Sequence, residues 1–264
     1  MLHARPVALR SASFLEHLHS IRARSCKQGN GQGHRRRRNF SCEAEQHSSA
    51  TLQRGQMDPQ AVPEALSQVE LLMQQGSRMT SVAQAVWAGF AREGDTVVDA
   101  TCGNGHDSKW LAQAVGPTGM LYAFDIQEDA IRSTRAVLED EVDPARLPTL
   151  EVVRACHSTL KEQVRGPVRL VCFNLGYLPG GDREVISRPS TTREAVEAAL
   201  DLLQPSGLVS VLCYTGHPGG REEYEVVRQL GSQQHPDSFT VFENRILSRP
   251  NAPVLLLFWK RPAQ

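Results

Sequence analysis

The sequence predicts an α/β fold, built on a mostly parallel sheet with helices on both faces. Three observations support this fold class. First, strand-like apolar runs alternate with amphipathic helical stretches from residue 97 onward, as in βα units. Second, a glycine-rich turn follows the first of these runs, and such turns form ligand crevices in doubly wound sheets. Third, residues 248–252, which contain Pro250, join the last two apolar runs. This short connection predicts an antiparallel hairpin at one edge.

The individual elements follow one another in a regular order. Two helices are expected before the sheet, over 63–75 and from 81 to Gly94, whose left-handed tolerance suits a helix end. The predicted strands cover 97–100, 121–125, 149–155, 168–174, 208–215, 238–246 and 253–260. The predicted helices between them cover 107–115, 129–141, 191–203 and 221–230, and residues 205–207 (Pro-Ser-Gly) are expected to close the third.

The stretch TVVDATCGNGHD (residues 96–107) contains the first candidate site. Its apolar pair VV predicts a strand buried on both faces, and Asp99 stands at the carboxyl end of that strand. Gly103, Asn104 and Gly105 then allow a tight turn with close approach of the backbone to a ligand. The spacing differs from the dinucleotide fingerprint G-x-G-x-x-G, because Ser108 stands three positions after Gly105. A purely structural turn is the alternative.

The next predicted strand, LYAFD, ends in Asp125, twenty positions beyond Gly105. At this spacing a carboxylate reaches the ribose of an adenosine in a nucleotide-binding βαβ unit. Asp125 could also be the N-cap of the following helix, and the two roles could coexist. The glycine turn and Asp125 together predict an adenosine-containing cofactor.

The stretch NLGYLPGGD begins where the apolar strand VRLVCF ends, so it is expected at the same sheet edge. Asn174 offers a carbonyl acceptor and amide donors in one rigid group. Tyr177 offers a flat face for a base and a hydroxyl at its tip. N-x-x-Y is similar to the Asn-Pro-Pro-Tyr motif of amino-methyltransferases, although Leu-Gly replaces Pro-Pro here. The alternatives are an Asx turn at Asn174 and a packing role for Tyr177.

Several stretches together resemble one enzyme family. They are DATCGNGHD, FDIQ, the His157-Ser158 pair, NLGYLPGGD, YTGHPGG and the final hairpin. The family is the S-adenosylmethionine-dependent tRNA 5-aminomethyl-2-thiouridine methyltransferases (MnmM/YtqB-like), also described as rRNA methylases. The resemblance runs from about Met79 to the C-terminus, and VISRPSTT replaces a Thr-rich stretch of the family. It implies a seven-stranded, Rossmann-like class I methyltransferase fold. It also implies methyl transfer from S-adenosyl-L-methionine to the aminomethyl nitrogen of wobble uridine 34.

The resemblance and the motif positions together indicate the site residues. The expected cofactor-binding residues are Asp99, Gly103, Asn104, Gly105, Asp107, Asp125, Gln127, His157, Ser158 and Asn174. The expected catalytic residues are Asn174, Tyr177 and Asp182, with Asp182 either a proton acceptor or a turn former. The expected substrate-binding residues are Tyr177, Gly180, Gly181, Thr191, Tyr214 and His217. His217 is either a base or the cap of the helix that follows.

The N-terminal segment differs in charge from the rest. Residues 1–42 hold nine Arg or Lys residues and one acid, Glu16; of the 29 basic and 29 acidic residues in the chain, 20 and 28 remain, a net charge of −8. An Arg-rich, Ser-containing, acid-poor start is typical of an organellar transit peptide. We therefore expect a transit peptide and disordered linker over 1–56 and a methyltransferase domain over 57–264, in an organelle, with the chloroplast favoured over the mitochondrion. The alternative is a basic arm that binds RNA through Arg35–Arg38.

The composition of the chain limits the kinds of binding partner that are expected. No stretch of 18 apolar residues exists, so no membrane association is expected. The six cysteines lack C-x-x-C spacing, which argues against a zinc site and fits a reducing compartment. Covalent attack by Cys102 is not expected, because the acceptor is an exocyclic amine. Arg183, Arg188, Arg193 and Arg221 are candidates for contacts with anticodon-loop phosphates of the tRNA. A homodimer is possible.

Three alternatives remain open from the sequence. The first is a methyltransferase of the same fold that acts on rRNA or a small amine. The second is an NAD-dependent oxidoreductase with an atypical glycine turn. The third is a non-catalytic RNA-binding protein that uses the basic arm.

Overall fold

The computed structural model describes residues 78–176 and 186–263. The helix expected over 63–75 and the expected transit peptide and linker lie outside these residues, as does most of NLGYLPGGD. The division into an extension over 1–56 and a domain over 57–264 therefore stays a prediction.

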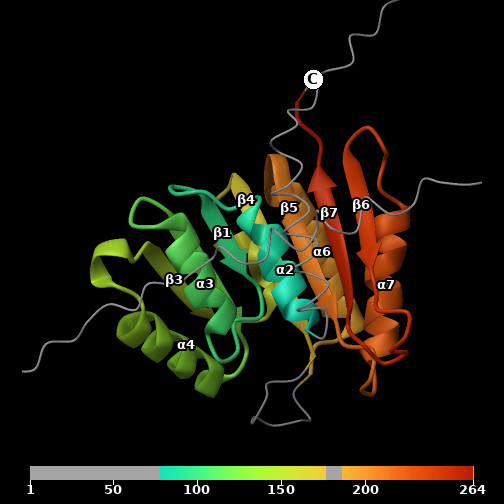
Figure 1. Ribbon diagram of the computed structural model, residues 1–264, viewed down its shortest axis with the longest axis horizontal. Helices are drawn as coiled ribbons and strands as arrows, with labels where there is room; N and C mark the ends of the chain where they lie inside the picture. The colour runs from blue at the N-terminus through green and yellow to red at the C-terminus, as the bar shows by residue number, and fades with distance from the viewer. Residues whose placement is uncertain (1–77, 177–185, 264) are drawn as a thin grey trace, which may run out of the picture. The chain divides into compact units, whose positions relative to one another are not determined.

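Seven strands form one sheet in the order β3-β2-β1-β4-β5-β7-β6 (Figure 1). Their bounds are β1 Thr96–Asp99, β2 Met120–Asp125, β3 Thr149–Arg154, β4 Val168–Leu175, β5 Leu203–Cys213, β6 Phe239–Asn244 and β7 Val254–Lys260. The strands β3, β2, β1, β4 and β5 are parallel, and β7 is antiparallel to both β5 and β6. This arrangement confirms the predicted mostly parallel sheet with a C-terminal antiparallel hairpin. From β1 the chain first adds β2 and β3 on one side and then β4 and β5 on the other. The strand order therefore reverses between β1 and β4, and ligands bind at this point in such folds.

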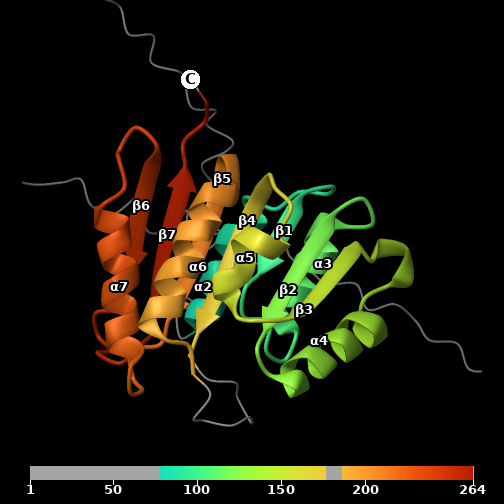
Figure 2. The ribbon, with the colours of Figure 1, turned by 180° about the vertical axis from the view of Figure 1, so that it is seen from behind.

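Helices cover both faces of the sheet. Their bounds are α2 Met79–Ala88, α3 His106–Val115, α4 Glu128–Glu141, α5 Leu160–Gln163, α6 Pro189–Leu202 and α7 Gly220–Ser232, with short 3-10 turns at Pro144–Arg146 and His157–Thr159. The helices α2, α3 and α4 pack on one face, and α5, α6 and α7 on the other, the latter seen from behind in Figure 2. In the described part of the chain, no helix has the length and apolarity needed to cross a membrane.

The strands supply both cores by alternation. Val97, Leu170 and Leu208 face the α2–α3 side, whereas their chain neighbours Val98, Val171 and Val209 face the α6–α7 side. All six side chains are at most 1% exposed. Because side chains alternate across a strand, a continuous apolar run is what a strand covered on both faces requires. Burial of each such side chain contributes about 1.5–3 kcal/mol, so these runs hold the strand ends in fixed positions.

Two predicted helix ends differ from the structure. The helix α2 ends at Ala88, not at Gly94. Gly94 has φ +86° and donates its N–H to the Val115 carbonyl at 2.9 Å, so its left-handed conformation serves the turn into β1. Residues 205–207 do not close α6, which ends at Leu202. They lie in the first part of β5, where the pairing with β4 shifts register between Val168 and Leu170.

Candidate active site

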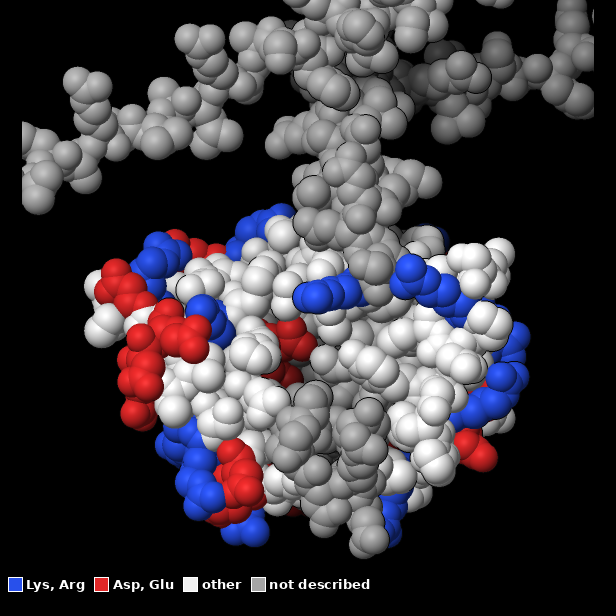
Figure 3. Space-filling view, turned by 60° about the horizontal axis from the view of Figure 1, so that its bottom comes forward, with Lys and Arg blue, Asp and Glu red and all other residues white. Residues whose placement is uncertain are grey.

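A cavity of about 720 Å³ lies at the carboxyl ends of the parallel strands. Figure 3 shows this face, with acidic side chains in a hollow near its centre. Nine of the predicted site residues line the cavity: Gly103, Asn104, Asp107, Asp125, Gln127, His157, Asn174, Thr191 and Tyr214. Its volume lies in the range of sites for cofactors and drug-sized ligands. The fold therefore brings together residues that are up to 111 positions apart in the sequence, from Gly103 to Tyr214.

The glycine turn is held between β1 and α4. Gly105 has φ +82° and precedes α3 as its N-cap. A Cβ at this position would lie 2.8 Å from the Thr134 Cα, so only glycine lets α4 approach the turn. Thr134 Oγ1 donates a hydrogen bond to the Gly103 carbonyl at 3.1 Å. Gly105 therefore shapes the cavity by packing behind it and is not one of the lining residues.

Asp125 joins two consecutive turns. Its Oδ2 accepts the Gly103 N–H at 3.1 Å, and its Oδ1 accepts the Gln127 N–H at 2.9 Å. Burial raises the pKa of the Asp125 carboxyl, and these hydrogen bonds oppose the rise. The N-cap of α4 is Gln127, so the alternative of Asp125 as the helix N-cap is wrong. A carboxylate oxygen can accept more than one hydrogen bond, so both oxygens can still receive a ligand hydroxyl.

Asp99 lies beneath the turn rather than at the cavity wall. It is 1% exposed. Ser108 Oγ donates to its Oδ2 at 2.6 Å, and the Thr101 N–H donates to its Oδ1 at 3.2 Å. Burial, with a further contribution from the nearby Asp107 charge, raises the pKa of Asp99 to about 7. In this position the carboxyl anchors the start of α3. Its predicted contact with a cofactor stays a prediction.

Asn174 is fixed by its neighbours at the end of β4. Its N–H donates to Thr101 Oγ1 at 2.7 Å, and its Nδ2 donates to Asp107 Oδ2 at 3.3 Å. Asp107 is held in turn by Gln84 Nε2, which donates to Oδ1 at 2.8 Å. Because both oxygens of Asp107 accept hydrogen bonds, the amide nitrogen of Asn174 faces Asp107. The carbonyl oxygen is then the group of Asn174 that can receive an N–H from a ligand.

His157 is a neutral, buried imidazole at the cavity wall. It is 8% exposed, and its ring meets Phe173 edge to face at 5.9 Å between centroids. Burial lowers the pKa of His157 to about 4, and a hydrogen bond with the Ala100 backbone opposes the fall. Its Nε2 has no hydrogen-bond partner among the described residues. A ligand with a polar edge, such as an adenine, would satisfy this atom. The adjacent Ser158 does not line the cavity.

The structure describes three of the remaining predicted residues and leaves four outside the described ranges. Thr191 and Tyr214 line the cavity, whereas His217 does not. The N-cap of α7 is Gly219, with φ +83°, so the proposed capping of α7 by His217 is wrong. Tyr177, Gly180, Gly181 and Asp182 lie outside the described residues, and their roles stay predictions.

Other lining residues were not predicted from the sequence: Thr101, His106, Cys156, Gly176, Ile186 and Ser187. Thr101 could have been found, because it follows the strand end that carries Asp99. No sequence motif around Ser187 indicates a site residue, because tertiary contacts place it in the cavity wall. Cys102 also lines the cavity, and burial raises the pKa of its thiol far above the ordinary value. This thiol is therefore not a nucleophile near neutral pH. Among the described residues, no group of His, Cys, Asp and Glu side chains could hold a metal ion.

Comparison with known proteins identifies the family. A family model described as "Putative rRNA methylase" matches residues 121–260, and a methyltransferase-domain model matches 91–142. A curated relative from Arabidopsis thaliana, tRNA (mnm(5)s(2)U34)-methyltransferase, chloroplastic, is 44% identical over 191 residues, 70% of each chain. The chain belongs to this methyltransferase family. The family was correctly predicted from the sequence motifs.

Solved structures agree with this assignment. A Clostridium thermocellum rRNA-methylase is 36% identical with a TM-score of 0.65, over 69% of this chain and 96% of its own. A Streptococcus mutans methyltransferase, solved in complex with SAH, is 29% identical with a TM-score of 0.61, over 69% and 98% of the two chains. The protein thus has the class I fold of S-adenosylmethionine-dependent methyltransferases, as predicted.

The cavity has the features that S-adenosylmethionine requires. The Asp125 carboxylate and Gln127 would hold the ribose hydroxyls, and the unpartnered Nε2 of His157 would meet the adenine edge. Gly103 and Asn104, at the turn before α3, would surround the methionine end. Asn174 lies across the cavity from β2 and β3, on the far side of β1 in the sheet order. This side of the cavity is therefore where an acceptor would lie.

Proposed function

We propose that this methyltransferase transfers a methyl group from S-adenosyl-L-methionine to the aminomethyl nitrogen of wobble uridine 34 in organellar tRNA. The observation that carries the proposal is the fixed carboxamide of Asn174, whose nitrogen is bound to Asp107 and whose carbonyl is left for an N–H donor. The proposal is supported by the name of the Arabidopsis thaliana relative, which is a U34 methyltransferase.

The acceptor must be uncharged to react. An alkyl amine with a pKa of about 10 lies roughly three units above neutral pH, so losing its proton costs about 4 kcal/mol. A dry cavity disfavours the charged amine. The Asn174 carbonyl would accept one N–H of the neutral amine and so aim its lone pair.

Bound S-adenosylmethionine would supply an activated methyl carbon on its sulfonium, and the Asn174 carbonyl would aim the neutral amine at it. The product ammonium then releases a proton. We assign the stacking of the uracil ring to Tyr177 and the acceptance of the proton to Asp182. These two assignments rest on the N-x-x-Y motif and on the position of the NLGYLPGGD stretch in the sequence.

Arginine side chains beside the cavity would hold the anticodon loop. Arg188 lines the cavity. Arg193 on α6 and Arg221 at the start of α7 each pair with a glutamate one turn away, at 3.7 and 3.9 Å. Such exposed pairs are weak, so both guanidinium groups could exchange a carboxylate for a phosphate. Binding of RNA through these groups should weaken as salt concentration rises. Arg183 lies outside the described residues, so its contact with the tRNA stays a prediction.

The Arg-rich residues 1–42 and the chloroplastic relative support import into an organelle, with the chloroplast favoured. A fusion of residues 1–56 to a fluorescent protein tests this. Uptake by chloroplasts is the expected result, and diffuse cytosolic fluorescence would contradict it. The possible homodimer stays a prediction.

The substrate is tested by methylation in vitro. The protein is incubated with labelled S-adenosylmethionine and an anticodon stem-loop that carries 5-aminomethyl-2-thiouridine at position 34. The matched control is the same stem-loop with unmodified uridine. Label should enter the first RNA and not the second. Methylation of an rRNA fragment but not of the stem-loop would favour the rRNA alternative. Titration with NAD, followed by calorimetry, tests the oxidoreductase alternative, and tight NAD binding without binding of S-adenosylhomocysteine would overturn the proposal.

A further inference from the structure

Glu223 is a buried carboxylate on α7 that the proposed reaction does not use. It is 1% exposed. Both of its oxygens receive hydrogen bonds from hydroxyls: Ser187 Oγ donates to Oε2 at 2.8 Å, and Thr192 Oγ1 donates to Oε1. Burial raises the pKa of Glu223, while these two hydrogen bonds and the neighbouring His217 lower it. A carboxyl in such surroundings is costly to keep, which calls for a specific role.

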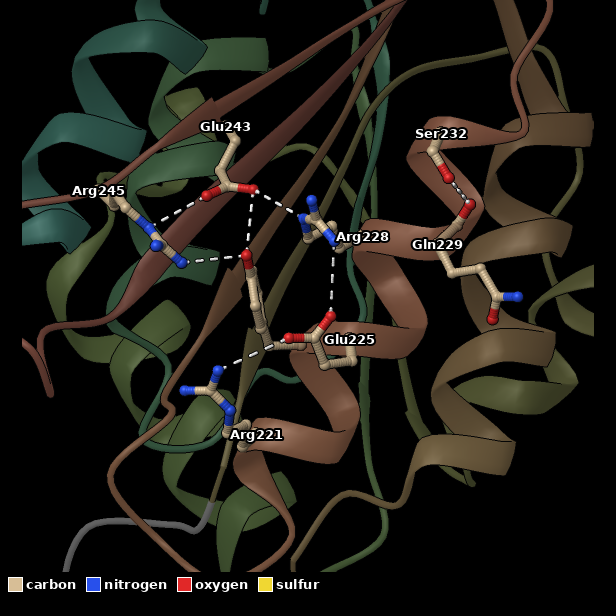
Figure 4. Close-up of polar contacts among 8 residues, drawn as sticks. Arg221, Glu225, Arg228, Gln229, Ser232, Glu243 and Arg245 are labelled. Carbon is tan, nitrogen blue, oxygen red and sulfur yellow. Dashed lines mark hydrogen bonds and ion pairs between the residues drawn. The ribbon is translucent and has the colours of Figure 1, made fainter.

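The other acids near α7 have ordinary surface surroundings. Glu225 pairs with Arg221 at 3.9 Å and with Arg228 at 3.7 Å on the outer side of the helix. Glu243 on β6 pairs with Arg228 and Arg245 and accepts a hydrogen bond from Tyr224. Figure 4 shows these residues joined into one network of alternating charges. Glu223 faces inward and binds hydroxyls instead of arginines.

Ser187 connects Glu223 to the cavity wall. Its Oγ accepts the Gly176 N–H at 3.1 Å, and its own N–H donates to the Gly176 carbonyl at 3.3 Å. Gly176 and Ser187 both line the cavity, and Gly176 lies two positions after Asn174. A chain of hydrogen bonds therefore runs from the Gly176 amide through the Ser187 hydroxyl to the Glu223 carboxylate.

The direction of this chain depends on Glu223. A hydroxyl carries one proton, and the carboxylate can only accept it. The Ser187 proton must therefore point at Glu223, which leaves a Ser187 lone pair for the Gly176 N–H. An amide at position 223 could accept a proton from only one of these two hydroxyls, because its nitrogen would present protons to the other, and a leucine could accept from neither.

We propose that Glu223 is a positioning residue, which acts through Ser187 to hold Gly176 and with it the acceptor side of the cavity beside Asn174. The proposal adds a remote group to the proposed reaction and rests on methyl transfer at this cavity. On the cofactor side, Asp125 accepts hydrogen bonds from Gly103 and Gln127, whereas the hydrogen bonds of Ser187 join Gly176 and Glu223. Glu223 should therefore affect turnover and not cofactor affinity.

The test compares Glu223→Gln with Glu222→Gln, the same chemical change at an exposed position of the same helix. The first readout is amide hydrogen exchange of the full-length protein. Exchange at Gly176 should become roughly tenfold or more faster in Glu223→Gln and stay unchanged in Glu222→Gln. The second readout is methyl transfer to the modified stem-loop. Its kcat should fall about 10- to 100-fold in Glu223→Gln, as expected for a small misplacement of an acceptor, with the KM for S-adenosylmethionine within about twofold.

A double variant tests whether Glu223 acts through Ser187. Ser187→Ala alone should reproduce the loss, and Glu223→Gln with Ser187→Ala should be no worse than Ser187→Ala. Thr192→Val removes the other hydroxyl and should leave the exchange of Gly176 near that of the wild type. The proposal would be overturned if the losses multiply in the double variant, or if exchange at Gly176 is unchanged in both Glu223→Gln and Glu223→Leu. Should Glu223→Gln fail to fold, Ser187→Ala supplies the same two readouts.

The outcomes separate the two proposals. A wild-type protein that methylates no RNA would contradict the proposed function, while the exchange of Gly176 would still decide the role of Glu223. A wild-type protein that is active on the stem-loop, with unchanged exchange at Gly176 in both Glu223→Gln and Glu223→Leu, would overturn the positioning role alone.

Discussion

The two sides of the cavity are built in different ways. On the cofactor side, consecutive βα units hold one another through backbone donors: the Gly103 and Gln127 N–H groups bind the Asp125 carboxylate. On the acceptor side, the wall depends on side chains from distant elements. Glu223 on α7 holds Ser187, which holds Gly176 at the end of β4.

Each side of the cavity should therefore be sensitive to different changes. The cofactor side consists of turns whose geometry the local sequence specifies, so changes there should reduce affinity for the cofactor. The acceptor side consists of groups placed by packing between α6, α7 and the sheet, so changes there should reduce turnover or stability. Substitutions on each side of the cavity test this division.

Asn174→Ala should separate the two sides most clearly. It removes the carbonyl proposed to orient the amine, and loss of one such oriented group lowers kcat by about 10²–10³-fold. The Asn174 backbone N–H still reaches Thr101, so the strand end should keep its place. Single-turnover methylation measures the rate, and calorimetry with S-adenosylhomocysteine measures the affinity. Asn244→Ala, at the exposed end of β6, is the control. A loss of affinity as large as the loss of rate would contradict the division.

Gly220→Ala should destabilise the acceptor side. A Cβ at Gly220 would lie 2.1 Å from the Tyr214 carbonyl oxygen. Relief of this clash must move α7 or the end of β5, which should lower the free energy of unfolding by about 3 kcal/mol. Gly216→Ala is the matched control, because its Cβ would meet its nearest neighbour at 3.7 Å. Urea denaturation measures both variants, and equal midpoints would show that the α7 turn yields more easily than the packing implies.

Asp125→Asn should affect the cofactor side alone. Its amide nitrogen would face one of the two N–H donors that the carboxylate now accepts, so one hydrogen bond is lost. The affinity for S-adenosylmethionine should fall by about 10-fold, as expected for 1.4 kcal/mol. Calorimetry measures the affinity, and kcat at saturating cofactor should stay within about threefold of the wild type, a tolerance that corresponds to less than 1 kcal/mol. A large fall in kcat at saturating cofactor, with unchanged affinity, would show that Asp125 acts on the acceptor side and not on the cofactor side.

The smallest effect is the pH dependence that Asp99 contributes beneath the cofactor side. Its pKa is about 7 in the folded protein, against an ordinary value of 3.8. Between these values the folded protein keeps a proton that the unfolded chain has released. Stability contributed by Asp99 is therefore present at low pH and is lost as pH rises through 7. The slope should be about −1 kcal/mol per pH unit between pH 5 and 6.

Asp99→Asn should remove this part of the slope. The difference between wild type and variant isolates Asp99 from Asp125 and Glu223, whose pKa values burial also raises. Urea denaturation at several pH values measures the free energy of unfolding of both proteins. Parallel pH profiles for the two proteins would show that Asp99 is ionised in the folded state.

Much of the fold follows from the sequence alone. The runs at Val97–Val98 and 168–174 are apolar at every position that the sheet buries, and the connection at 248–252 is too short for anything but a hairpin. The expected end of α2 and the expected role of residues 205–207 were wrong, because Gly94 suits a turn and residues 205–207 suit a bulged strand. A glycine or proline signals a special backbone conformation without saying which element uses it.

Patterns among neighbouring residues were enough to place Asp125 and Asn174 at the ends of their strands. That information is local, because alternation along a strand and the position of its end are properties of neighbouring residues. Three features could be seen only in the folded structure: Asp107 fixes the Asn174 amide, Asp99 lies below the turn and Glu223 reaches Ser187. These contacts depend on how separate elements pack, and burial between packed elements is also what changes the protonation of Asp99 and His157.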